Sequence, residues 1–375
     1  ANASSTLSTT GVGVSVAILV GDLINKAELS GTHKTGYFLV KAGMGKDGEN
    51  DRVNDIQVIS ISGAGASNVG VAGAVAINIF DTEYAATQNG TLTATNAAQI
   101  SEVTAKVNQK VVTRAGASAD LAGAGSSTST GTGTSAGTGT SGTGTSGSSK
   151  KSVGVGASFA LTIADAKADA VVNGTIQTAG NLQIEGIVIS DVETKAVAGN
   201  DAYEEPAEDG KIKINTTSNP QNEKEITVSD LADVALNLWN LLANKNYYLE
   251  AVGGSAADTA TTFTGAGSFT VLVAQDTVEA LVGKNVVLVL TDGLTVTAAS
   301  KVNAVTIAGS VAYGGSKSAG IGVNTIVNDT AVRAELGDNT NVTVNNGDVR
   351  ISADGDLNLV SVLVAASVSS TKTGS

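Results

Sequence analysis

The sequence predicts an all-β protein, a parallel β-helix whose coils stack into one solenoid. Three observations predict this class: a long internal repeat, segments in which apolar and polar residues alternate, and a composition of small side chains. Of 375 residues, 45 are glycine and 2 are proline, there is no cysteine, and aromatic residues make up 3%. The core must therefore consist mainly of small and β-branched side chains, which suit the narrow interior of a solenoid.

The repeat unit has a glycine-spaced opening, an apolar strand and a polar link that ends at an alanine. The closing alanines are Ala27, Ala86, Ala170, Ala280 and Ala334. Their spacings are 59, 84, 110 and 54 residues, so about 54 is the bare period and the longer spacings contain insertions. The pattern predicts a single β-helix over residues 1–375 with about five 54-residue repeats.

Short alternating segments, such as Gln57–Ser62 and Leu182–Glu185, are expected to be strands of five to eight residues. Each unit then holds about six strands, or two coils of three strands. The turn-forming runs Asn345–Asp348 and Asp354–Asp356 are expected at corners between strands. The alternative is a multi-sheet antiparallel sandwich, which would need hairpin turns at short regular spacing instead of a 54-residue register.

Two further patterns refine the expected coils. The pairs Gly11-x-Gly13 and Gly154-x-Gly156 each lead into a strand rather than a helix, so we interpret them as coil corners and not as phosphate-binding loops. The run Val286–Leu290 is continuously apolar and is expected to be buried on both faces.

Two insertions interrupt the repeat. Residues 118–151 are dominated by glycine, serine and threonine, which predicts a flexible low-complexity loop. Residues 200–256 contain both prolines and the single tryptophan. Within them, Ser229 can cap a helix that ends near Lys245 and carries one apolar stripe, and short strands flank it. This predicts a small inserted α/β subdomain with one helix.

Acidic residues gather after the first repeat, at Asp47, Glu49, Asp51 and Asp55. Carboxylate oxygens at such spacing are candidate ligands for Ca²⁺, the only cofactor that the chain suggests. The segment lacks the spacing of an EF-hand loop, and a polar surface loop is the simpler interpretation.

Aromatic residues concentrate in the second insertion, at Tyr203, Trp239, Tyr247 and Tyr248. Exposed aromatic side chains favour contacts with sugars or proteins, so this group is a candidate site for a partner or a glycan. The alternative is that the segment is a small cap packed on the side of the β-helix, with Trp239 as its core.

The composition excludes several functions. The absence of cysteine removes thiolate metal sites and cysteine nucleophiles, and a single histidine, His33, removes histidine clusters. A net charge of −13 with few aromatic residues disfavours nucleic acid as a partner. No catalytic residues stand out, although a solenoid would align some carboxylates of the polar links with one another. The candidates for such alignment are Asp165, Asp169, Asp276 and Asp329.

The repeats resemble those of very large bacterial surface proteins, the filamentous-haemagglutinin-like adhesins and the fusobacterial-leukotoxin-type β-helical exoproteins. The segments that carry the resemblance are Gly70–Asn78, Gly154–Leu161 and Val349–Leu359. The resemblance implies a non-enzymatic segment of a giant extracellular protein that serves as an adhesin stalk, filament or cell-surface matrix component, and both ends look cut from something longer.

The partners that the resemblance implies are neighbouring repeats of the same chain or other copies, and a glycan or protein of a host or neighbouring cell. The alternative function is a β-helical protein that binds or degrades polysaccharide.

Overall fold

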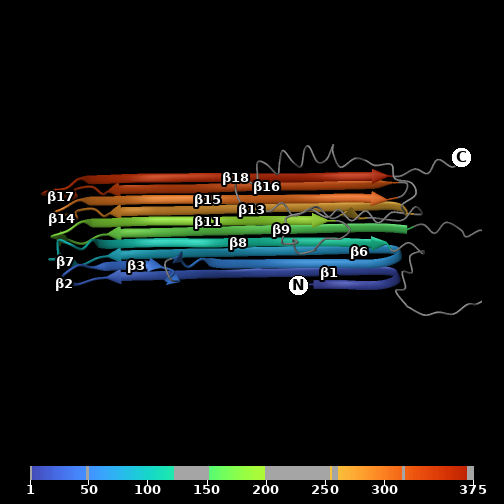
Figure 1. The fold of residues 1–375 in the computed structure, drawn as a ribbon, viewed down its shortest axis with the longest axis horizontal. Coiled ribbons are helices and arrows are strands. Elements are labelled where there is room, and N and C mark those ends of the chain that lie inside the picture. The colour runs from blue at the N-terminus through green and yellow to red at the C-terminus, as the bar shows by residue number, and fades with distance from the viewer. Residues whose placement is uncertain are drawn as a thin grey trace, which may run out of the picture.

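The structure is a computed structural model, and it describes residues 2–47, 50–121, 152–198, 254–255, 261–314 and 317–369. These residues form a parallel β-helix, so the predicted fold class is confirmed (Figure 1). Among the described strands all neighbours run parallel except β4 (Lys46–Asp47) and β5 (Asn50–Asp51), which form a hairpin, and this excludes the antiparallel sandwich. No helix in the described part of the chain is long and apolar enough to cross a membrane.

Each coil has two long strands joined by one short strand. In the third coil these are β9 (Ser152–Val172), β10 (Ile176–Thr178) and β11 (Leu182–Ala198). The outgoing long strands stack into layer I, the returning long strands stack into layer II, and the short strands stack into an end sheet. The two layers face each other, and the end sheet closes one side of the space between them (Figure 1).

The strands of each layer are as follows. Layer I contains β1 (Asn2–Leu29), the second half of β6 (Asn54–Gln88), β9, β13 (Thr261–Val282) and β16 (Ser318–Leu336). Layer II contains β3 (Leu39–Gly43), the first half of β6, β8 (Ser101–Leu121), β11, β12 (Gly254–Ser255), β15 (Leu294–Gly314) and β18 (Val349–Ser369). The end sheet contains β2 (Thr32–Thr35), β7 (Thr91–Ala94), β10, β14 (Val287–Leu290) and β17 (Asn341–Val344).

The five closing alanines of the repeat lie side by side in layer I. Ala27 pairs with Ala86, Ala86 with Ala170, Ala170 with Ala280, and Ala280 with Ala334. One repeat unit is therefore one coil, and the expectation of two coils of short strands per unit is wrong. The strands are longer than expected, 21 residues in both β8 and β9, because their glycines and small polar residues do not interrupt pairing.

The glycines that open each unit lie inside strands and not at corners, contrary to the expectation for Gly11, Gly13, Gly154 and Gly156. A Cβ atom on Gly13 would collide with the backbone oxygen of Gly63. A Cβ atom on Gly320 of β16 would likewise collide with the backbone oxygen of Ala366, so glycines such as Gly13 and Gly320 let the two layers approach closely at the edge opposite the end sheet, which we call the thin edge. Asp354–Asp356 likewise lies inside β18, whereas Asn345–Asp348 forms the expected corner between β17 and β18.

The true corners next to the end sheet use a different set of glycines. Gly31 has a φ of 88°, and Gly90 and Gly174 follow it in the next two coils. A Cβ atom on Gly90 would collide with the backbone oxygen of Gly31, and one on Gly174 with that of Gly90. Because the corner backbones of the first three coils stack directly on one another, only glycine fits at these three positions.

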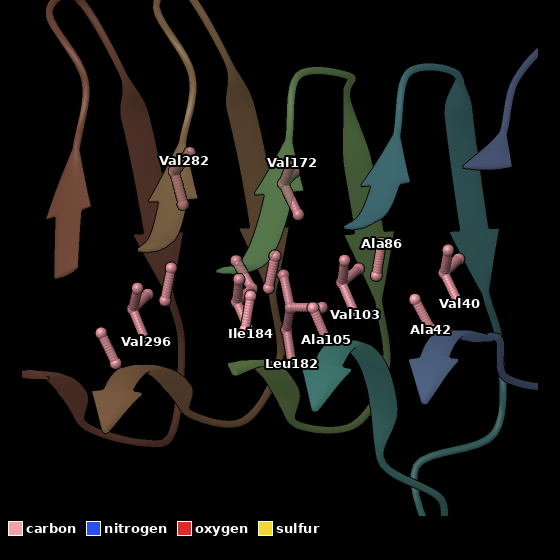
Figure 2. Packing of buried hydrophobic residues seen from close by; sticks show 14 of the residues in the cluster. Val40, Ala42, Ala86, Val103, Ala105, Val172, Leu182, Ile184, Val282 and Val296 are labelled. Atoms are coloured by element: carbon pink, nitrogen blue, oxygen red, sulfur yellow. The ribbon is translucent and has the colours of Figure 1, made fainter. Parts of the chain in front are cut away.

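The interior tapers from the end sheet to the thin edge. Near the end sheet large side chains such as Leu92, Leu182 and Leu288 are fully buried, and Figure 2 shows Leu182, Ile184 and Val103 pointing into this space. Near the thin edge the interior consists mainly of small residues, alanines such as Ala74 and Ala117 and serines such as Ser62. The taper explains the scarcity of aromatic residues, since only the wide part of the interior can hold a ring such as that of Tyr84.

The run Val286–Leu290 is not buried on both faces as expected. Val287 is 38% exposed, while Leu288 and Leu290 are fully buried. The end sheet has one face against the core and the other toward solvent, so only alternate residues of β14 are enclosed.

Both predicted insertions leave the solenoid at its thin edge. β8 continues to Leu121, so the first residues of the 118–151 segment belong to a strand, and residues 122–151 lie outside the described residues. The second insertion interrupts a strand position of layer II, because Ala198 pairs with Ser310 and Gly254 pairs with the next residue, Val311. Gly254 and Ser255, which were expected in the α/β subdomain of residues 200–256, therefore belong to layer II as β12. The rest of that segment, including the predicted helix, lies outside the described residues and remains a prediction.

Candidate functional site

The predicted calcium ligands lie around the β4–β5 hairpin. Asp47 belongs to β4 and Asp51 to β5, while Glu49 lies outside the described residues. Asp55 starts β6 with an exposed side chain, which accepts hydrogen bonds from Gln57 Nε2 at 3.0 and 3.1 Å. The described residues contain no group of three or more acidic, histidine or cysteine side chains arranged to hold a metal ion. Calcium binding at this hairpin remains a prediction.

The second predicted site is the aromatic group of the second insertion. Tyr203, Trp239, Tyr247 and Tyr248 all lie outside the described residues. Their role in binding a partner or glycan therefore stays a prediction from sequence.

The solenoid does align carboxylates, as the sequence suggested. Asp22, Asp81 and Asp165 pair in register on three neighbouring strands of layer I and face outward, and Asp329 lies in the same row beyond Gln275. Burial raises the pKa of Asp165, and the charge and hydrogen bond of Asp81 raise it further. Asp169 lies in a different outer row, where Lys167 Nζ contacts it at 2.7 Å.

Asp276 points the opposite way, into the core, and is 2% exposed. The hydroxyl of Ser190 donates to Asp276 Oδ1 at 3.5 Å, and Gln109 Nε2 donates to Ser190 Oγ at 3.2 Å. Thr82 completes this buried chain by donating to Gln109 Oε1 at 2.9 Å. Burial raises the pKa of Asp276 to about 7. A carboxyl enclosed in this way cannot contact a polymeric substrate, so it is no acid–base partner for the surface carboxylates.

The outer face of layer II carries a shallow hollow of about 400 Å³. Its outward-facing lining consists of Ile187, Ile189, Ala299, Lys301, Asp354 and Asp356. Lys301 pairs in register with Asp356, so one cation and two carboxylates border an apolar floor. Such an open, mixed surface could accommodate a segment of polysaccharide, but it presents no pair of enclosed carboxylates for cleaving one.

The last coil exposes the interior of the solenoid. On β18, the inward-facing residues Val349 and Ile351 are 48% and 44% exposed, although their partners in the preceding coil, Leu294 and Val296, are 1% and 0% exposed. Leu357, Leu359 and Leu363 are likewise 42–52% exposed. Among the described strands, each strand of this coil pairs on one side only. This open end is the surface that a further coil would cover, and sequence patterning could not reveal it, because the pattern is the same in covered and uncovered coils.

In comparisons with known proteins, no family model, no curated protein and no solved structure matches the chain.

Proposed function

We propose that this chain is a segment of a giant extracellular bacterial repeat protein, in which it forms part of an adhesin stalk, a filament or a cell-surface matrix. The observation that carries the proposal is the combination of uniform coil register with an open end. The register of layer I continues across all five of its strands, and the last coil leaves apolar interior residues uncovered. A free edge with an apolar core behind it favours pairing with another coil.

The sequence beyond β18 supports the same proposal. Thr371-Lys372-Thr373 repeats the pattern of Ser316-Lys317-Ser318, which leads into β16. The spacing is 55 residues, the same as between the register partners Asn303 and Asn358 of β15 and β18. Each additional coil of this kind would lengthen the solenoid by about 4.8 Å, so many repeats would make a long, stiff rod.

The surface suits a protein outside the cell. The chain has a net charge of −13 and no cysteine, so it would stay soluble without depending on disulfide formation. The resemblance to secreted bacterial adhesins supports this location, with neighbouring repeats, other copies, or a glycan or protein of another cell as partners and with no enzymatic activity.

Immunogold electron microscopy of intact producing cells, with antibodies against this chain, tests the proposal. We expect gold particles on fibres outside the cell, and we expect protease added to the intact cells to remove them. Labelling confined to the cell interior would refute the proposed location. Sequencing the gene on both sides of the segment tests whether the repeat continues. We expect further 54-residue units there.

The hollow on layer II favours the second candidate function, binding or degradation of polysaccharide. Incubation with a panel of acidic and neutral polysaccharides distinguishes the two functions. Turnover would replace the structural proposal by an enzymatic one. Binding without turnover, weakened by Lys301→Ala, would add a glycan site to the stalk.

A further inference from the structure

The outer face of layer I is apolar over the half that lies nearer the thin edge. Five register rows cross the five strands here, and Thr325 is the one polar outward-facing residue among these positions. The three rows on the side of the end sheet are Val16–Val75–Phe159–Phe269–Val323, Ile18–Ile77–Leu161–Val271–Thr325 and Val20–Ile79–Ile163–Val273–Val327. The two rows nearer the thin edge contain only valine, isoleucine, alanine and glycine. We call this surface the apolar field.

In the apolar field the larger apolar side chains face solvent and the smaller ones face the core, which is the reverse of the usual arrangement in a strand. In β6 the inward-facing residues at this end are small, such as Ala72, Ala74 and Ala76, while the outward-facing ones are Val71, Gly73, Val75 and Ile77. The larger side chains therefore face away from the solenoid. On β1, Ile18 and Val20 are 62% and 70% exposed, and on β16 Ile321 is 60% exposed.

Layer II is different at the same depth of the strands, which the contact of Thr162 with Thr194 marks. The ion pair between Arg114 Nε and Glu193 Oε1 at 2.9 Å lies on its outer face there, and the apolar residues Val305, Ile307 and Val362 of that face are only 3–5% exposed. The exposed apolar surface is thus a property of one layer, not of the composition of the whole chain.

The size of the apolar field matches that of a protein interface. Five strands about 4.8 Å apart and five rows about 6.6 Å apart cover about 24 Å by 33 Å, or about 800 Å². Stable protein–protein interfaces bury about 800 Å² on each partner, whereas the largest apolar patch of a typical monomer is about 300–600 Å².

We propose that a second copy of this chain packs against the apolar field, so that two solenoids join face to face through layer I. A flat sheet of aliphatic side chains fits another flat sheet, and the same surface on two copies gives a closed, two-fold interface. This inference rests on the sheet face alone and does not depend on the proposed stalk, to which it would add lateral pairing.

The charges around the field favour a second copy over a lipid surface. The acidic row of Asp22, Asp81, Asp165 and Asp329 borders the field, and the chain carries a net charge of −13. Both features repel anionic membranes. With the strands of the two copies antiparallel, the acidic row of each lies at opposite margins of the interface, and the two rows do not face each other.

Analytical ultracentrifugation of the 375-residue chain between about 1 and 100 µM tests the proposal, because typical dimers of this interface size dissociate at or below this range. We expect a dimer. Ile77→Lys, inside the field, should weaken it at least about a hundredfold, since the interface would bury an unpaired charge. Ile189→Lys, an outward-facing isoleucine of layer II, is the matched control and should leave the dimer unchanged.

A chemical measurement avoids substitutions that introduce charge. Because the chain has no cysteine, Val75→Cys in the field and Ala299→Cys on layer II each supply a single thiol. We expect alkylation of the first thiol to slow at least about tenfold as the protein concentration passes the dissociation constant, and that of the second to stay constant. Three results would overturn the proposal: a wild-type monomer throughout, equal alkylation of both thiols, or a dimer that survives Ile77→Lys while circular dichroism shows both lysine variants folded.

Discussion

At the scale of single residues, the buried carboxyl of Asp276 makes the stability of the folded protein depend on pH. Its carboxyl lies between the layers with 2% of its surface exposed, and Ser190 on the opposite layer donates to one oxygen. Among the described residues no hydrogen-bond partner reaches the other oxygen, Oδ2. Burial raises the pKa to about 7, because the ionised form loses more hydration than one hydroxyl can replace.

This residue should make the protein less stable as pH rises from about 4 to 7. The unfolded chain releases the proton near the ordinary value of 3.8, whereas the folded protein keeps it up to about 7. The contribution of this carboxyl to the free energy of unfolding is therefore fully present below about pH 4. It falls by at most about 4 kcal/mol as the pH rises to about 7. Asp276→Asn should flatten the profile, as measured by urea unfolding between pH 4 and 8.

The exposed carboxylate Asp329 supplies the control, since Asp329→Asn should retain the slope of the wild-type profile. Parallel pH profiles for the wild type and Asp276→Asn would show that the buried carboxyl does not govern the stability.

At the scale of elements, buried threonines connect the two layers. Thr113 of β8, Thr194 of β11 and Thr306 of β15 pair in register along layer II. Thr162 of β9 crosses from layer I, and its Oγ1 lies 2.7 Å from that of Thr113 and 2.6 Å from that of Thr194. In the last coil Asn324 takes a similar place, and its Nδ2 donates to Ser361 Oγ at 2.9 Å. Such polar rows distinguish the correct register from a slipped one.

Thr162→Val should destabilise the protein by about 1–3 kcal/mol, because it leaves two buried hydroxyls without this partner. Replacing Thr113, Thr162 and Thr194 together by valine should cost less than the three single substitutions combined, since no polar group is then stranded. Equilibrium urea unfolding measures both effects. Thr295→Val, on the outer face of layer II, is the control and should change little. Strict additivity of the three substitutions would contradict the proposed chain of hydrogen bonds.

On the scale of the whole molecule, stability should vary from coil to coil. A solenoid gains its stability from contacts between neighbouring coils, so coils with one neighbour are weaker than coils with two. We expect backbone amides of β16 and β18 to exchange hydrogen faster than those of β8, β9 and β11, by about tenfold or more. Hydrogen exchange followed by mass spectrometry measures this gradient, and uniform exchange along the described coils would contradict it.

Much of the architecture could be predicted from sequence. The alanine spacing identified register partners in advance, because a solenoid places residues one period apart on neighbouring strands. The length of the strands could not be predicted, since alternation at period 2 is the same in a strand of five residues and in one of 21. The glycines at Gly11, Gly13 and Gly154 suggested corners, but they lie inside strands, where Gly13 leaves room for the backbone of the opposite layer.

The candidate surfaces, too, could be predicted from the sequence only in part. The alignment of Asp165 with Asp329 followed from the repeat, whereas the inward direction of Asp276, one residue beyond the row, depends on the strand's exact phase. The apolar field was invisible because its outer valines alternate with inner alanines and glycines, so the segment looks apolar on both faces.

The sequence by itself determined the fold class and the partner of each layer I strand, because local alternation and a fixed period specify both. Only the tertiary structure decided which of two apolar faces lies inside and how far the apolar interior is exposed in the last coil. Both depend on the distance between layers and on neighbours along the solenoid axis, and neither quantity is encoded in a single repeat.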